Sequence, residues 1–171
     1  MIRILVFILA TLFVHTPAES TPFSNFKLLG PRIKLNAMTD RDSVHSGDRF
    51  RLYLSVQIEE GWHIYSLQPL DGNELLATQI VLEKNVFQSI GDWQESKTHL
   101  IQDDAQDKLV KGHTTTVEFY QDFLVPEKII SGSYSLKGKL LYRACDNKLC
   151  TLPQGISFDS LINVNQAHLL D

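Results

Sequence analysis

The chain has 171 residues, and its 16 lysines and arginines against 20 aspartates and glutamates give a formal net charge of −4. The basic residues are scattered and form no block, which excludes the electrostatic footprint of a nucleic-acid-binding protein. The length predicts a single domain once an N-terminal leader is set aside.

The first 20 residues have the pattern of an export signal. Arg3 supplies a short basic region, and residues 4–14 form an almost unbroken apolar run. This run is too short for a membrane span, which needs about 20 residues. Ala18 and Ser20 fit a small-x-small cleavage pattern. We therefore expect a signal peptide at residues 1–20, an exported domain without a membrane span at residues 21–171, and, as the alternative, an uncleaved N-terminal anchor.

Beyond an irregular stretch at residues 21–32, the chain shows the period-two pattern of β-strands. The clearest case is residues 49–58, where five apolar side chains alternate with polar ones: Phe50, Leu52, Leu54, Val56 and Ile58. Further strands are predicted at residues 32–38, 62–66, 78–82, 86–90, 114–125, 133–144 and 156–164.

Two polar stretches lack a sustained period and are predicted to be loops. They lie at residues 68–76 and 92–111, and the second carries Asp103, Asp104 and Asp107. Many short strands without a convincing amphipathic helix predict an all-β fold, in particular a β-sandwich. A closed barrel is the alternative that the pattern leaves open.

Cys145 and Cys150 are the only cysteines, and they flank the turn-forming sequence Asp-Asn-Lys at residues 146–148. In an exported protein such a pair is expected to form a disulfide. So small a ring contributes only about 2 kcal/mol of stability, against roughly 3–5 kcal/mol for long loops. A domain of this length can also bury a sufficient core without a disulfide.

Three roles therefore stay open for the cysteine pair: a structural disulfide, disulfide exchange, and Cu(I) binding through soft thiolates. A zinc site is not predicted, because zinc sites need clustered ligands and the chain has no second cysteine pair. The five histidines that follow the predicted signal peptide are dispersed without ligand spacing: His45, His63, His99, His113 and His168.

Two segments resemble the N-terminal periplasmic domain of the bacterial thiol:disulfide interchange protein DsbD. The first reads Gly-Trp-His-Ile-Tyr-Ser at residues 61–66, followed by Pro69 and Asp71. The second reads Tyr-Arg-Ala-Cys-Asp-Asn-Lys-Leu-Cys-Thr-Leu-Pro at residues 142–153. Both segments occur in the order found in that family, and the resemblance extends over residues 33–164.

The resemblance implies an immunoglobulin-like β-sandwich with Cys145 and Cys150 as a redox-active disulfide that needs no cofactor. It implies that the pair takes electrons from a membrane-embedded donor and passes them to thioredoxin-fold oxidoreductases, which isomerise disulfides or serve cytochrome c biogenesis. Cys150 matches the thiol that attacks the partner disulfide. His63 and Tyr65 match an aromatic pair near the active site, with strand packing as their alternative role.

The sequence departs from the family in two respects. Family members continue into a membrane domain and a thioredoxin-like domain, whereas this sequence ends at Asp171. We therefore expect a stand-alone module with a separate membrane electron donor, or a domain whose redox role has drifted. The family's cap loop corresponds to residues 107–113, where Leu109 and Val110 take the place of its aromatic shield, and an ordinary polar loop is the alternative.

Besides thiol–disulfide exchange, the sequence leaves a second function open. The chain would then be a non-catalytic secreted β-sandwich that binds a protein or copper, with a structural disulfide.

Overall fold

The structure is a computed structural model that describes residues 30–165, so the predicted signal peptide lies outside the described residues. Within this range the chain forms twelve β-strands and one short 3-10 helix, which confirms the predicted all-β fold. The strands make three open four-stranded sheets rather than a closed barrel. No helix within residues 30–165 has the length and apolar character to cross a membrane.

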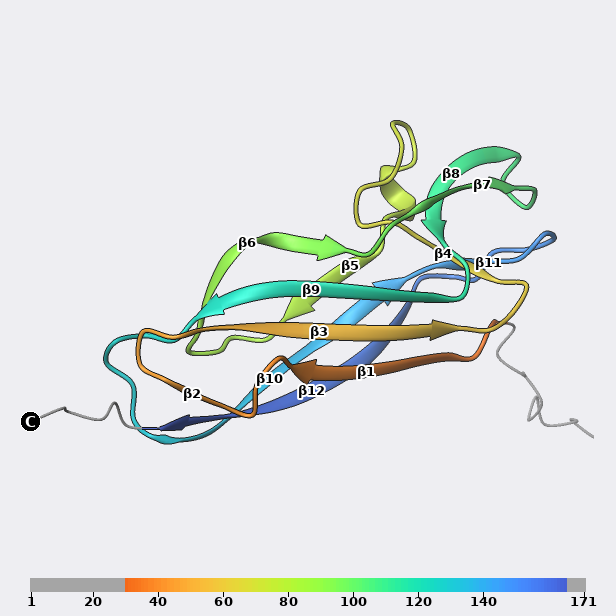
Figure 1. Ribbon diagram of the computed structural model, residues 1–171. Coiled ribbons are helices and arrows are strands. Elements are labelled where there is room, and N and C mark those ends of the chain that lie inside the picture. Colours follow the sequence, from red (N-terminus) through yellow and green to blue (C-terminus); the bar gives the residue numbers. More distant parts are fainter. Residues whose placement is uncertain (1–29, 166–171) are drawn as a thin grey trace, which may run out of the picture.

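Two of the sheets form the sandwich (Figure 1). The first sheet has the order β1 (Ile33–Thr39), β3 (Arg49–Ile58), β9 (Thr116–Leu124) and β6 (Gln88–Glu95), and all its neighbours are antiparallel. The second sheet has the order β2 (Ser43–His45), β12 (Gln154–Asn165), β10 (Gly132–Tyr142) and β5 (Gln79–Leu82). In this second sheet only the pair of β2 and β12 is parallel.

Alternation along β3 builds the core between these two sheets. Phe50, Leu52, Leu54 and Val56 are buried, while the residues between them stay partly exposed. Partners from both sheets join the same cluster and include Val117, Phe119, Phe123, Leu136, Leu140, Phe158 and Ile162. Fully burying a side chain of this kind contributes roughly 1.5–3 kcal/mol. The sandwich therefore has a core of its own that does not depend on the cysteines.

The third sheet stands at one end of the sandwich (Figure 1). Its order is β11 (Ala144–Cys145), β4 (His63–Tyr65), β8 (Lys108–His113) and β7 (His99–Asp103), and a 3-10 helix, η1 (Glu74–Leu76), follows β4 in the chain. Gly61, at a φ of 82°, turns the chain from β3 into β4. In the pairing of β11 with β4, Cys145 lies opposite His63.

Close packing of β4 against β8 requires a glycine at residue 112. A Cβ atom built on Gly112 would lie 2.3 Å from the carbonyl oxygen of Ile64, closer than any side chain tolerates. Gly112 is paired with Tyr65 in this sheet. The absence of a side chain at this position thus lets the β7–β8 hairpin lie directly against the strand that carries His63 and Tyr65.

All eight predicted strands overlap strands of the structure, but the predicted loop at residues 92–111 is wrong. That stretch contains the end of β6, all of β7 and most of β8. Strand β6 runs on from the predicted strand through an irregularity between Ile90 and Gln94. The β7–β8 hairpin covers only a small apolar cluster, to which it contributes Ile101 and Val110, so its sequence shows no sustained alternation.

The buried position of Leu54 predicts that Leu54→Ala lowers the free energy of unfolding by about 2–5 kcal/mol, because the shortened side chain leaves a cavity. The matched control is Leu161→Ala in β12, where the leucine is 65% exposed; we expect a change within about 0.5 kcal/mol. Urea unfolding followed by tryptophan fluorescence measures both values. Equal losses in the two variants would contradict this assignment of the core.

Candidate functional site

Cys145, the last residue of β11 in the third sheet, forms a disulfide with Cys150 across a hairpin. Their Cα atoms are 4.1 Å apart. The carboxylate of Asp146 accepts hydrogen bonds from the backbone N–H groups of Lys148 and Leu149, at 2.7 and 2.8 Å. These bonds lower the pKa of Asp146 below its ordinary value and form the Asx-type turn expected from this sequence. The turn thus has hydrogen bonds of its own in addition to the disulfide.

The two sulfur-bearing residues differ in their access to solvent. Cys145 is completely buried in a small cluster with Tyr65, Leu76 and Val110, whereas Cys150 is only partly buried at its edge. A reagent or partner protein that approaches the hairpin therefore meets Cys150 before Cys145. Susceptibility to exchange depends on which sulfur can be reached.

Tyr65 lies beside both sulfurs. Its hydroxyl oxygen is 2.8 Å from Sγ of Cys145 and 3.7 Å from Sγ of Cys150. The same hydroxyl donates a hydrogen bond to the carboxylate of Asp103 over 2.6 Å. Burial and then this hydrogen bond raise the pKa of Tyr65 well above its ordinary value, so the phenol stays protonated.

Asp103 is completely buried and is the functional candidate that the sequence did not single out. Nε2 of His63 lies 3.3 Å from Oδ2 of Asp103, the oxygen that also accepts the hydrogen bond from Tyr65. Ligand atoms of His63, Asp103 and Cys145 all lie within 4.8 Å of one another. The only sequence signal for Asp103 was its place among three acidic residues in a polar stretch.

The β7–β8 hairpin covers the disulfide, and the residue of this hairpin that bonds to Cys150 is Gln106. Its side-chain Nε2 donates a hydrogen bond to Sγ of Cys150 over 3.4 Å, and its backbone N–H donates to Oδ1 of Asp103. Of the two residues expected in the cap, Val110 is buried in the cluster with Cys145. Leu109 is 50% exposed and does not belong to that cluster.

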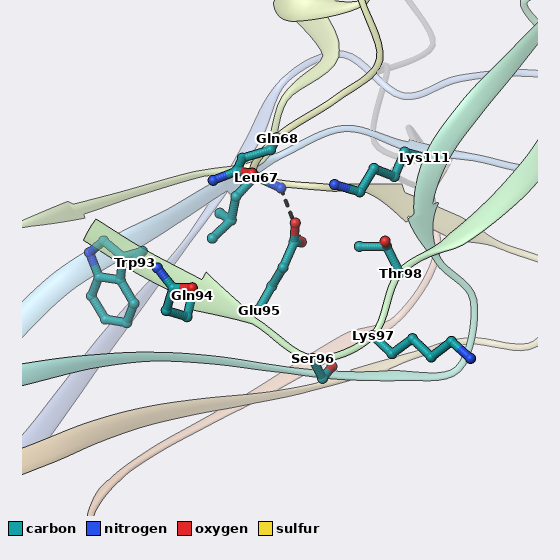
Figure 2. A pocket seen from close by; sticks show the side chains of 9 residues that line it. All are labelled: Leu67, Gln68, Trp93, Gln94, Glu95, Ser96, Lys97, Thr98 and Lys111. Atoms are coloured by element: carbon teal, nitrogen blue, oxygen red, sulfur yellow. Dashed lines mark hydrogen bonds between the residues drawn. The ribbon is translucent and has the colours of Figure 1, made fainter. Parts of the chain in front are cut away.

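A second buried polar group attaches the third sheet to the first. Glu95 of β6 accepts hydrogen bonds from the side chain of Ser66 and the backbone N–H of Leu67, and it lies 2.8 Å from Nε2 of His113. Figure 2 shows Glu95 pointing to the Leu67 backbone at the edge of a cavity of about 290 Å³. Burial alone would raise the pKa of Glu95, but its hydrogen bonds lower it below the ordinary value.

A different cavity, of about 370 Å³, opens beside the hairpin that carries the disulfide. Its lining includes Trp62, His63, Ile101 and Asp146. The cavity gives a route from solvent to the imidazole of His63, on the flank of the buried cluster. The cavity of Figure 2 has no cysteine in its lining and is not part of this site.

The fold and the site together define an immunoglobulin-like β-sandwich with a hairpin disulfide held at one end beside a hydrogen-bonded tyrosine and carboxylate. Over residues 36–161 the chain matches the family described as the N-terminal domain of the thiol:disulfide interchange protein DsbD, and it belongs to that family. The matched range contains all four strands of the third sheet and both cysteines. A search of curated proteins gives no match for this chain.

Among solved structures, the N-terminal periplasmic domain of ScsB from Proteus mirabilis is similar in fold, with a TM-score of 0.52 and 19% identity. The match covers 76% of this chain and 45% of that one, so this chain spans less than half the length of the ScsB structure. Two weaker likenesses have TM-scores below 0.5 and carry no argument. One is a family 123 glycoside hydrolase from Clostridium perfringens, with a TM-score of 0.39 and 9% identity, where the match covers 78% of this chain and 27% of that one. The other is the sporulation control protein Spo0M from Bacillus subtilis, with a TM-score of 0.36 and 11% identity, where the match covers 80% of this chain and 50% of that one.

The contact between Gln106 and Cys150 predicts that Gln106→Ala speeds the reduction of the disulfide by dithiothreitol severalfold, because the exposed sulfur loses its cover. Leu109→Ala, on the same hairpin but directed to solvent, is the matched control and should keep the wild-type rate. The rate is followed by trapping free thiols at successive times. Equal rates in all three proteins would show that Gln106 does not shield the sulfur.

The lowered pKa of Glu95 predicts a specific loss of stability in acid. A carboxylate whose pKa is depressed by folding contributes stability above its unfolded pKa of about 4.3 and loses it as pH falls through the folded value. Wild-type protein should therefore lose more unfolding free energy than Glu95→Gln when urea unfolding is repeated at decreasing pH below this value. Parallel losses in the two proteins would contradict the prediction.

Proposed function

We propose that this chain is a periplasmic thiol–disulfide exchange domain that relays electrons through Cys145 and Cys150 to or from thioredoxin-fold partners. The observation that carries the proposal is the unequal exposure of the two sulfurs in one hairpin disulfide. Membership of the DsbD N-terminal family supports exchange as the chemistry. The export signal expected from the sequence and the periplasmic origin of the ScsB domain support the location.

In the reduced state Cys150, as the more exposed thiol, attacks a sulfur of the partner disulfide and forms a mixed disulfide. Cys145 then attacks Sγ of Cys150 and releases the partner as a dithiol. Two electrons pass from this chain to the partner, whose two sulfurs take up two protons. The reverse sequence recharges the domain from a dithiol donor, and the family implies a donor that is embedded in the membrane.

Tyr65 and Asp103 act on the resolving thiol in this scheme. The phenol of Tyr65 lies where it can relay the thiol proton of Cys145: the phenol oxygen accepts that proton while its own O–H proton passes to the carboxylate of Asp103. Removal of the proton from Cys145 is required before it can attack, because the thiolate is the nucleophile. Tyr65 is therefore proposed as the group in contact with the reacting sulfur, and Asp103 as the residue that orients it.

The exposed apolar surface near Cys150 supports a protein as the partner. Leu149 precedes Cys150 and is 36% exposed, and Leu152 follows it and is 82% exposed. Apolar side chains at the margin of a reactive group favour docking of another protein surface. Thioredoxin-fold oxidoreductases that serve disulfide isomerisation or cytochrome c biogenesis are the proposed class.

Single-cysteine variants expressed in the native periplasm test this proposal. Cys145→Ser should accumulate high-mass adducts that dissociate with reductant, because the exposed Cys150 attacks a partner and no thiol resolves the product. Cys150→Ser is the matched control and should accumulate few adducts, because Cys145 is buried. Chelator is present throughout, so that metal binding does not influence the result.

The reduction potential of the wild-type domain provides a second readout. An exchanging pair should lie above about −300 mV, the level below which structural disulfides are found. If neither variant traps a partner and the potential lies below this level, the domain is not an exchange module. The disulfide of Cys145 and Cys150 would then have only a structural role.

A further inference from the structure

The cluster under the hairpin contains the donor set of a metal site that no sequence spacing announces. His63 and Asp103 are 40 residues apart, and Cys145 comes from a third segment, yet their ligand atoms lie within 4.8 Å of one another. Cys150 is joined to this group through the disulfide. Reduction of that bond would add two thiolates to one imidazole and one carboxylate.

We propose that the reduced form of this protein binds one Zn²⁺ ion through Cys145, Cys150, His63 and Asp103, and that the oxidised form does not. The inference requires only that the disulfide can be reduced and does not depend on the proposed exchange with partners. It makes the cluster a metal site that the redox state of the hairpin opens and closes.

The geometry and chemistry of the four donors favour zinc. In a tetrahedral site with zinc–nitrogen and zinc–oxygen bonds of about 2.0–2.2 Å, neighbouring ligand atoms are about 3.4 Å apart. Nε2 of His63 and Oδ2 of Asp103 are 3.3 Å apart already. Zinc accepts sulfur, nitrogen and carboxylate oxygen together, whereas Cu(I) favours soft sulfur ligands and gains little from a carboxylate.

The surroundings hold the carboxylate in place as the outer groups of metal sites do. Tyr65 donates a hydrogen bond to Oδ2 of Asp103 and the backbone N–H of Gln106 donates to Oδ1, so both oxygens are oriented and each retains a lone pair. Such outer hydrogen bonds fix ligand geometry and raise affinity. The cavity lined by His63, Ile101 and Asp146 supplies a route for the ion to the imidazole.

Zinc binding requires that the disulfide is reduced first. A dithiol or phosphine reductant delivers two electrons, the bond between the two sulfurs breaks, and two thiols form. Zn²⁺ then displaces the two thiol protons, which leave to solvent, and forms two zinc–sulfur bonds. Thiolates held by zinc are removed from exchange until the ion is withdrawn, so zinc would act as an inhibitor of the reduced form.

Cobalt and zinc titrations of the purified domain test the proposal. The domain is reduced with tris(2-carboxyethyl)phosphine and titrated with Co²⁺, which reports tetrahedral thiolate coordination by its visible and near-ultraviolet absorption, and Zn²⁺ is then added to displace it. We expect one ion per chain, strong tetrahedral bands, displacement by Zn²⁺, and no binding to the oxidised domain. A reduced domain that gives no such bands, or a Cu(I)-only site, would overturn the proposal.

Two conservative variants with matched controls identify the ligands. Asp103→Asn and His63→Gln should each weaken Zn²⁺ binding by at least about tenfold, since loss of even an outer partner costs 10–100-fold. Asp104→Asn and His45→Gln change exposed residues of the same types and should bind as wild type does. Near-ultraviolet circular dichroism of the oxidised proteins checks that each variant is folded. The zinc affinity of a folded variant then shows whether the substituted residue is a ligand. Wild-type affinity in a folded variant would remove the substituted residue from the ligand set and overturn the four-ligand assignment.

This experiment and the trapping experiment fail independently. Trapping is done with chelator present, so loss of zinc binding leaves the mixed disulfides unchanged. Conversely, a domain that binds zinc when reduced but traps no partner would retain the metal site and lose the proposed exchange function.

Discussion

The end of the molecule that carries the disulfide depends on keeping one buried carboxylate hydrogen-bonded. Removing an ionised carboxylate from water costs several kcal/mol unless nearby groups replace its hydration. Asp103 is completely buried, and its partners come from two places: Tyr65 and His63 of β4, and Gln106 of the turn after β7. The same hydrogen bonds that satisfy Asp103 hold the β7–β8 hairpin against β4 and place Tyr65 beside the sulfurs.

The sandwich and the third sheet have different tasks. The core around β3 and β9 is apolar and contains no cysteine, and Ile64 of β4 and Ala144 of β11 pack into it. The apolar cluster beside the cysteines is small by comparison, and polar contacts surround it. Glu95 of the first sheet also links the two parts. It contacts Ser66, which follows β4, and His113 of β8, which belongs to the third sheet. The disulfide is thereby placed on a small sheet that is joined to the sandwich by both apolar and polar contacts.

The sequence predicted the sandwich well, because strands with one buried face show strict alternation, as in residues 49–58. It also predicted the neighbourhood of Cys145 with His63 and Tyr65, although only through resemblance to a family. It did not predict β7 and β8, where Ile101 and Val110 are too few to give a period. Asp103 was missed for a related reason: its burial arises from contacts with a segment about 40 residues away, and no local pattern records them.

The Asp146 turn has a consequence for the lifetime of any covalent complex at this site. Its hydrogen bonds to Lys148 and Leu149 belong to the backbone of the turn and do not require the disulfide. A hairpin held in this way keeps Cys145 close to Cys150 while Cys150 is bonded to another protein, so the second sulfur attacks at a high effective molarity. Covalent complexes with the wild-type chain would then be short-lived, and the hairpin would favour rapid turnover over capture.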